Sequence, residues 1–299
     1  MNDIVNVTNI ADYNRILGAE TLHPLVSVTD FASLRTLPHC RKNFGFYAIF
    51  YKELECGTLL YGRSKYDYED GTLVFISPGQ IAGTNDGGET PNPRGLVLMF
   101  HPDFLHGTSL ARRMGDYSFF GYESNEALHM SDREKQLILQ CFHDIQEELS
   151  HPFDKHTKRI VASYIETLLN HCMRFYDRQF STRQAANKDQ LSQFEHVLRQ
   201  YFESDQPIET GLPSVQYCAD RMHLSPNYFG DLVKKETGRT AQEYIQLATI
   251  SRAKDLLLAT GSTVSEIAYQ LGFKYPHHLS RVFKKVVGVS PLEYRAQAV

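Results

Sequence analysis

The most informative absences in this 299-residue chain concern membranes and redox chemistry. No apolar run reaches the roughly 18 residues that a membrane-spanning helix needs, and the first residues lack a basic stretch followed by an apolar one. The five cysteines are scattered, with no C-x-x-C pair and no even framework, which is typical of a reducing compartment. The sequence therefore predicts a cytoplasmic protein with no membrane partner and with buried or idle thiols.

The motifs of common catalytic and nucleotide-binding sites are also missing. The chain has no G-x-S-x-G, no P-loop and no G-x-G-x-x-G. A metal site needs several converging ligands, and no H-x-H followed by a glutamate occurs among the N-terminal histidines. These dispersed histidines are His23, His39, His101, His106 and His129. We therefore predict that the chain is not an enzyme and uses no metal or other cofactor.

The formal net charge of -4 conceals an uneven distribution. Residues 214–299 hold 11 basic and 7 acidic side chains, a net charge of +4. The rest of the chain holds 20 basic and 28 acidic side chains, a net charge of -8. An acidic N-terminal part followed by a basic C-terminal part fits a sensor joined to a DNA-binding domain.

Residues 25–120 have the composition of β-strands. Segments rich in Phe, Tyr, Ile, Val and Thr cover residues 44–54, 57–79 and 94–100, and turn signals separate them. Residues 86–93 are predicted to form a loop. Many short strands with regular turns indicate an antiparallel sandwich or barrel.

The pattern becomes helical after residue 130. Residues 131–149 have apolar side chains at a helical period, and Ser131 with Glu134 forms a capping box. A second helix is predicted over residues 154–175, and the helical region extends to about residue 180. This second helix has more apolar surface than a lone surface helix needs. A dimer interface and packing against its own barrel explain that surface equally well.

A polar stretch without periodicity follows Phe180 and predicts an interdomain linker over residues 181–189. The first domain would then cover residues 1–180, and an all-helical second domain would cover residues 190–299.

Two similar segments dominate the second domain. The first runs from Ser214 to Gly238 (SVQYCADRMHLSPNYFGDLVKKETG), and the second from Val264 to Gly288 (VSEIAYQLGFKYPHHLSRVFKKVVG). Each contains a short apolar-periodic helix, a tight break and a second helix that ends in Lys-Lys before a glycine. This is the pattern of a helix-turn-helix unit, whose second helix enters the DNA major groove. Two units in tandem make double-stranded DNA the predicted partner.

A continuous helix over residues 241–258 joins the two segments. At 1.5 Å per residue it spans roughly 27 Å. Successive major-groove entries on one face of DNA lie about 34 Å apart. We therefore expect one protomer to place its two recognition helices in adjacent grooves and to bind two half-sites.

Helical periodicity assigns the outward side chains of the two recognition helices. Arg281 is the best candidate for a base contact, because a guanidinium pairs with guanine through two hydrogen bonds. Asn227 suits adenine or a phosphate, and the lysines suit phosphates or are ordinary solvated helix ends. The two histidines either donate to the DNA or are merely exposed. The predicted DNA-binding residues are Asn227, Tyr228, Asp231 and Lys234 in the first unit, and His277, His278, Ser280, Arg281 and Lys284 in the second.

The segment from Val264 to Arg295 resembles the signature of the AraC/XylS family of bacterial transcription regulators. The matching positions are Ile267-Ala268, Gly272-Phe273, Arg281, Phe283-Lys284, Gly288, Ser290-Pro291 and Tyr294-Arg295. The first unit is similar as well, so the resemblance covers about residues 190–299. Asp231 stands where the family often has arginine, and His277-His278 replace a common Ser-Tyr pair. Asp231 either accepts from a cytosine amino group or weakens the first unit.

The resemblance implies a multi-domain α+β fold. Its N-terminal part would be a cupin-like antiparallel β-barrel with two C-terminal helices. An all-α domain with two helix-turn-helix units joined by a long helix would follow. The barrel would bind a small-molecule effector, the helices would form a homodimer, and RNA polymerase would be a partner. The segment YEDGTLVFISPG, residues 68–79, looks like a cupin turn and strand.

Three functions remain open at this point. The leading hypothesis is a sequence-specific transcription regulator in which an effector shifts the population of DNA-competent arrangements. The second is a DNA-binding regulator without a ligand. The third is a cupin enzyme with a helical accessory domain, which stoichiometric bound metal would favour.

Overall fold

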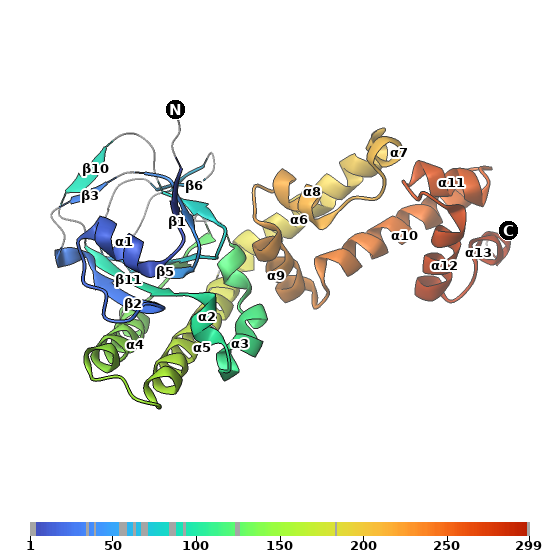
Figure 1. Ribbon diagram of the computed structural model, residues 1–299. Helices are drawn as coiled ribbons and strands as arrows, with labels where there is room; N and C mark the ends of the chain where they lie inside the picture. Colours follow the sequence, from blue (N-terminus) through green and yellow to red (C-terminus); the bar gives the residue numbers. More distant parts are fainter. Residues whose placement is uncertain are drawn as a thin grey trace. The chain divides into compact units, whose positions relative to one another are not determined.

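The computed structural model describes residues 4–33, 36–38, 40–53, 59–61, 64–66, 71–83, 88–91, 94–122, 126–182 and 184–297. They form two compact units that divide between Thr182 and Arg183 (Figure 1). Within the described ranges, no helix has both the length and the apolar character that a membrane crossing requires. The first unit combines strands and helices, and the second is helical, so the predicted α+β organisation is confirmed.

Short strands predominate up to Phe100, as the composition predicts, but the expectation of strands as far as residue 120 is wrong because residues 102–121 form short helices. The strands are β1 (Val5–Val7), β2 (Val26–Asp30), β3 (Thr36–Pro38), β4 (Lys42–Phe44), β5 (Tyr47–Lys52), β6 (Leu59–Tyr61), β7 (Ser64–Tyr66), β8 (Thr72–Ile76), β9 (Ile81–Ala82), β10 (Glu89–Pro91), β11 (Gly95–Phe100) and β12 (Leu128–His129). The predicted loop over residues 86–93 is wrong at β10, which pairs with β3. Its short polar sequence lacks the apolar alternation that marks a strand.

The main sheet has the strand order β12-β8-β5-β11-β2, and every neighbouring pair is antiparallel. In its centre, Ile49 pairs with Phe75 on one side and with Leu98 on the other. The other described strands form the separate sheets β1-β4-β9, β10-β3 and β6-β7. The described strands thus form several sheets, and one closed sheet is not among them.

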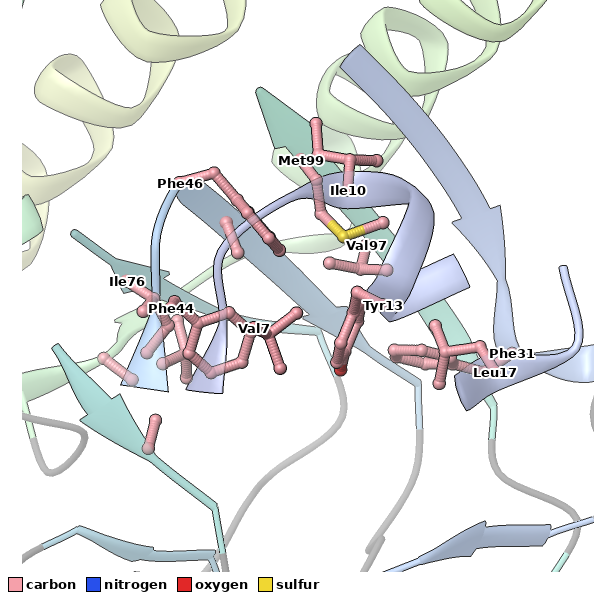
Figure 2. Close-up of a cluster of buried hydrophobic side chains, with 14 residues drawn as sticks. Val7, Ile10, Tyr13, Leu17, Phe31, Phe44, Phe46, Ile76, Val97 and Met99 are labelled. Atoms are coloured by element: carbon pink, nitrogen blue, oxygen red, sulfur yellow. The ribbon is translucent and has the colours of Figure 1, made fainter. Parts of the chain in front are cut away.

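Helix α1 (Ile10–Leu17) covers one face of the main sheet, and the composition did not predict it. The Asn9 side chain caps its start by accepting from the Asp12 amide at 2.8 Å, and Gly18 ends it in the left-handed conformation. Ile10, Tyr13 and Leu17 pack into the core with sheet residues such as Val97 and Met99 (Figure 2). Rings of Tyr13, Phe44 and Phe46 meet edge to face at 5.6–6.2 Å.

Two long helices complete the first unit, α4 (Asp132–Ser150) and α5 (Thr157–Thr182). The capping box of Ser131 and Glu134 is confirmed, as is the predicted buried face of α4. In α5 the buried face includes Val161, Ile165 and Leu169, and the helix contacts α4 and β12. Packing inside the unit therefore accounts for the apolar side of α5. The short helices α2 (Pro102–Leu105) and α3 (Ser109–Arg113) lie between β11 and β12 in the sequence.

The described cysteines are free thiols, and three of them are buried. Burial raises the pKa of Cys141 to about 11 and that of Cys218 to about 12, so both are protonated at neutral pH. Cys172 is buried too, and Cys40 is half-buried. The expectation of buried or idle thiols is thus confirmed at three positions, and Cys56 lies outside the described residues.

The second unit is entirely helical. Its helices are α6 (Gln184–Glu203), α7 (Gln206–Thr210), α8 (Val215–Arg221), α9 (Pro226–Thr237), α10 (Ala241–Ala259), α11 (Val264–Gln270), α12 (Pro276–Val287) and α13 (Pro291–Gln297). The long connecting helix is confirmed within one residue as α10. Helix α6 begins at Gln184, so most of the predicted linker is helical. The stretch includes Gln184, Ala185, Ala186 and Lys188, which have good helix propensity and need no apolar period to form a helix.

Candidate nucleic-acid interface

Helices α8 and α9 form the first helix-turn-helix unit. At the start of α9 the Ser225 hydroxyl accepts from the Tyr228 amide at 3.2 Å, and Pro226 occupies the first helical position. At the end of α9, Gly238 has a φ of +71° and donates its amide to the Lys234 carbonyl. A side-chain cap, a proline at the first position and a left-handed glycine at the end therefore bound this recognition helix.

Helices α11 and α12 form the second unit. A capping box starts α11, in which the Thr263 amide donates to the Glu266 carboxylate at 2.7 Å. This hydrogen bond and the one from the Thr263 hydroxyl lower the pKa of Glu266 below its ordinary value. The start of α12 differs from that of α9, because Tyr275 provides no side-chain cap. Gly288 ends α12 with a φ of +92°.

Each unit has its own apolar core, and α10 contributes to both. The first core contains Phe194, Leu198, Cys218, Ala219, Phe229, Val233, Ala241 and Ile245. The second contains Ile250, Ala253, Leu256, Leu257, Ile267, Ala268, Leu271, Phe273, Leu279 and Phe283. One side of each helix is apolar at the helical period, and these sides form the two cores.

The surface of α9 carries fewer exposed candidates than the sequence indicates. Asn227 and Lys234 are exposed, and Asp231 is half-buried. The expectation that Tyr228 projects outward is wrong, because its side chain is only 4% exposed. Tyr228 and Phe229, with Leu232 and Val233 one turn later, form a buried face broad enough to take in the tyrosine.

The surface of α12 is the more basic of the two. His277, Arg281 and Lys284 are exposed, whereas His278 and Ser280 are half-buried. Within the part of the chain that the structure describes, the Arg281 guanidinium has no ion-pair or hydrogen-bond partner. Its five N–H donors are therefore available for an external acceptor.

An aromatic cluster at the start of α12 was missed by the sequence reasoning. The Tyr275 ring stacks on His277 at 5.6 Å between centroids, and the rings of His277 and His278 meet at 4.4 Å. The Lys274 ammonium lies 5.8 Å from the centroid of Tyr275. Tyr275 is 47% exposed, so the cluster presents polar ring atoms and a cation beside the first turn of the recognition helix. Pro276, the first residue of α12, marks the start of this helix in the sequence and is the one local signal that could have pointed to Tyr275.

Many residues of the quoted family signature have structural roles. The Arg295 guanidinium donates to the carbonyls of Leu257 and Ser262 at 2.8 and 2.7 Å, and so fastens α13 to the end of α10. The Tyr294 ring meets Phe283 at 5.5 Å. The signature thus describes mainly the frame that holds α12, while Arg281 and Lys284 lie on its exposed side.

Comparison with known proteins agrees with this geometry. Residues 218–297 match a protein-family model described as a helix-turn-helix domain. The chain is 33% identical over 102 residues to the uncharacterized HTH-type transcriptional regulator YtdP of Bacillus subtilis, which covers 34% of this chain and 12% of YtdP. It is 28% identical over 179 residues to the uncharacterized HTH-type transcriptional regulator YijO of Escherichia coli, which covers 59% of this chain and 58% of YijO.

Among solved structures, the C-terminal domain of the response regulator yesN from Fusobacterium nucleatum is 26% identical, with a TM-score of 0.31. That alignment covers 35% of this chain and 95% of the yesN domain. The chain spans less than two thirds of the length of both curated relatives. Residues 218–297 therefore form a helix-turn-helix domain, similar to the corresponding part of proteins named as HTH-type transcriptional regulators.

Proposed function

We propose that the whole chain is a sequence-specific transcription regulator that binds two DNA half-sites through α9 and α12. The observation that carries the proposal is the tandem arrangement of two recognition helices, each with exposed lysines in its last turn and its own apolar core. Basic side chains at these positions suit phosphates, and Arg281 suits a base edge. The predicted DNA-binding residues other than Tyr228 remain part of this proposal.

The alternative of a cupin enzyme has less support. Both curated relatives described above are named as transcriptional regulators. The metal-binding histidine pattern of a cupin enzyme is also missing from the sequence. The helical unit, residues 183–299, fits both a regulator that responds to a ligand and a regulator that does not.

We further propose that the first unit is a cupin-like sensor that binds a small-molecule effector. A cavity of about 280 Å³ lies in this unit and is lined by His23, Phe104, Leu149, Phe153, Lys158 and Val161 among others. The His23 Nδ1 accepts from the Leu25 amide at 3.1 Å, so the neutral ring carries its proton on Nε2. Burial, and then the Lys158 charge, lowers the pKa of His23, which favours this neutral form. Homodimerisation and contact with RNA polymerase also belong to the proposal.

Selection of bound duplexes from a random DNA pool tests the proposed function, with the full chain used in the presence and absence of a cell metabolite extract. We expect enriched duplexes to contain two half-sites about 10 base pairs apart, centre to centre. The logarithm of the affinity for these duplexes should fall linearly with the logarithm of the salt concentration. No enrichment over the starting pool in either condition would exclude sequence-specific binding.

The metabolite arm separates the two kinds of regulator. A change in enrichment or affinity with extract supports an effector, and Lys158→Ala should weaken that response if the cavity holds the molecule. Identical selections with and without extract would favour regulation without a ligand. Sedimentation of the full chain measures the oligomeric state independently.

A further inference from the structure

The two helix-turn-helix units differ at the same position of the turn. In the first unit His223 has a φ of +56°, and in the second Gly272 has a φ of +89°. The turns close in the same way, since the Leu224 amide donates to the Ala219 carbonyl at 3.0 Å and the Phe273 amide to the Ala268 carbonyl at 2.9 Å. A histidine fits the first turn, so the turn itself does not demand glycine. The second turn must therefore have a further requirement.

That requirement is the close approach of another segment. A Cβ atom added to Gly272 would lie 2.5 Å from the carbonyl oxygen of Gly211 and 2.8 Å from that of Pro207. Backbone atoms at these distances cannot move aside as a flexible side chain does. The segment from α7 to Gly211 therefore rests directly on the turn of the second unit, which agrees with the contacts between α7 and α11.

Two tyrosines attach the same segment to the first helix-turn-helix unit. The Tyr201 hydroxyl of α6 donates to the Gly211 carbonyl at 2.7 Å and lies 2.8 Å from the Thr210 hydroxyl. The Tyr217 hydroxyl of α8 donates to the Gln206 side chain at 2.6 Å. The two tyrosine rings meet at 4.9 Å, and Tyr201 is 2% exposed. Residues 206–211 with Tyr201 and Tyr217 form what we call the α7 clamp.

The clamp gives the two units a second connection beside α10. If α10 were the sole connection, the two helix-turn-helix units could rotate relative to each other about the axis of α10. A second attachment restricts that rotation. Phe202, next to Tyr201, packs against the second core and reinforces this connection. The relative placement of α9 and α12 then depends on the clamp as well as on α10.

We propose that the α7 clamp fixes the placement of α9 relative to α12 and thereby selects the spacing of the two DNA half-sites. The inference rests on the proposed function, because it assumes that both helices enter DNA. One base pair of added spacing moves a half-site by about 3.4 Å and rotates it around the duplex. A rigid pair of recognition helices accepts such a change only if the DNA deforms.

Gly288 provides a control for a variant of Gly272, because the two glycines have nearly the same positive φ. Gly211, Gly272 and Gly288 have φ values of +91°, +89° and +92°. Gly211 also has a ψ of -150°, against -23° at Gly288, and it belongs to the clamp, so Gly211→Ala is not a control. Gly272→Ala places a Cβ against backbone atoms below 3 Å, whereas at Gly288 nothing lies within 4 Å. Comparing Gly272→Ala with Gly288→Ala separates the clash with the clamp from the strain of a positive φ.

Hydrogen exchange of the full chain without DNA tests the clamp itself. Gly272→Ala should speed exchange in residues 206–212 about tenfold or more, although this segment lies some 60 residues away in sequence. Gly288→Ala should leave residues 206–212 unchanged. Tyr201→Phe, which removes the hydroxyl that contacts Gly211 and Thr210 and adds no volume, should give a smaller acceleration in the same segment. Unchanged exchange there in both Gly272→Ala and Tyr201→Phe would overturn the clamp.

Binding to duplexes whose half-site spacing varies one base pair at a time tests its consequence. The wild-type chain and Gly288→Ala should both prefer one spacing by about tenfold over its neighbours. In Gly272→Ala the preference should fall below about threefold. An equally sharp preference in Gly272→Ala would overturn the role in spacing. If the wild-type chain bound no duplex, the proposed function would fail, while the exchange experiment would still decide whether the clamp exists.

Discussion

The two helix-turn-helix units share a backbone plan but differ in their surfaces. Both have a buried phenylalanine in the recognition helix, Phe229 and Phe283, and both end that helix at a left-handed glycine. On the outward side, a half-buried Asp231 in the first unit corresponds to an exposed Arg281 in the second. What the repeat preserves is the frame, and what it varies is the surface.

This difference assigns unequal roles in DNA binding. Arginine pairs with guanine and is attracted by phosphates, whereas aspartate is repelled by phosphates and can only accept, for example from a cytosine amino group. The second unit also has the Tyr275-His277-His278 cluster, where the corresponding positions of the first are Ser225, Asn227 and Tyr228. We therefore expect the second unit to supply most of the affinity and the first to tune it.

The largest expected effects come from the two cores and test whether the frames are truly equivalent. Phe229→Ala and Phe283→Ala each remove a fully buried ring, which costs about 3–5 kcal/mol. Urea titration of the full chain, followed by exchange protection of residues 215–237 and 264–287, measures both losses. Leu292→Ala is the control, because a side chain that is 67% exposed should change stability by no more than about 0.5 kcal/mol.

A clear inequality between the two losses would break the comparison. If either phenylalanine variant lost less than about 1 kcal/mol, that ring would not be the centre of its unit's core. Equal losses would leave the surfaces as the source of any functional difference.

The next effect in size concerns the recognition surfaces. Arg281→Ala should cost about 1–3 kcal/mol of discrimination between the selected duplex and random DNA, whereas Asp231→Ala should leave binding unchanged or strengthen it. Lys284→Ala should weaken binding to both duplexes alike and reduce the salt slope by about 1. Titration of labelled duplexes at several salt concentrations measures all three.

Arg15→Ala controls for the loss of a positive charge, because Arg15 is an exposed residue of the N-terminal unit, residues 1–182, and lies outside both helix-turn-helix units. If Arg281→Ala weakened both duplexes equally, Arg281 would be a phosphate contact and not a base contact. If Asp231→Ala lost more affinity than Arg281→Ala, the order of the two units would be reversed.

The frame could be predicted from the sequence because its signals are local. Ser225 and Pro226, then a helical apolar period, then Gly238 define a helix without reference to the rest of the chain. The same holds for the capping box of Ser131 and Glu134 and for the long helix α10. The C-terminal helices follow from such signals, and five of the nine predicted DNA-binding side chains are exposed. Their role in DNA binding stays a prediction.

The remainder depends on contacts that local patterns do not encode. Tyr228 has a polar end, so periodicity alone did not decide that the packed face of α9 extends to include it. The contact of Gly211 with Gly272 joins residues about 60 positions apart and leaves no trace in either segment beyond the glycines. In the N-terminal unit, residues 1–182, the composition of the strands does not specify how they divide among separate sheets.

A smaller effect is expected at the starts of the recognition helices. Ser225→Ala removes the hydroxyl that accepts from the Tyr228 amide, and should cost about 1 kcal/mol. Tyr275→Ala should cost less stability, because Tyr275 makes no side-chain cap for α12. Thermal unfolding of the two variants compares the costs, and a greater loss of stability in Tyr275→Ala would show that the aromatic cluster itself stabilises the helix start.

The smallest expected effect is a pH-dependent change in stability. It distinguishes α11, the first helix of the second helix-turn-helix unit, from α8, the first helix of the first. The lowered pKa of Glu266 means that its capping box stabilises the fold above the ordinary value of 4.5 and stops doing so as the pH falls through the lowered value. In the first unit, Ser214 caps α8 and Tyr217 occupies the corresponding position, so its cap has no charge to lose.

Glu266→Gln should therefore lower the melting temperature at pH 7, and the gap to the wild type should close in acid, where the wild-type carboxyl is protonated. Ser214→Ala should lower the melting temperature by an amount that does not vary between these conditions. Melting curves of the three chains from pH 3 to pH 7 measure both gaps. A gap for Glu266→Gln that stayed constant down to pH 3 would mean that the side-chain amide fails to replace the carboxylate for a geometric reason. The charge of the capping box would then not be what distinguishes the second unit.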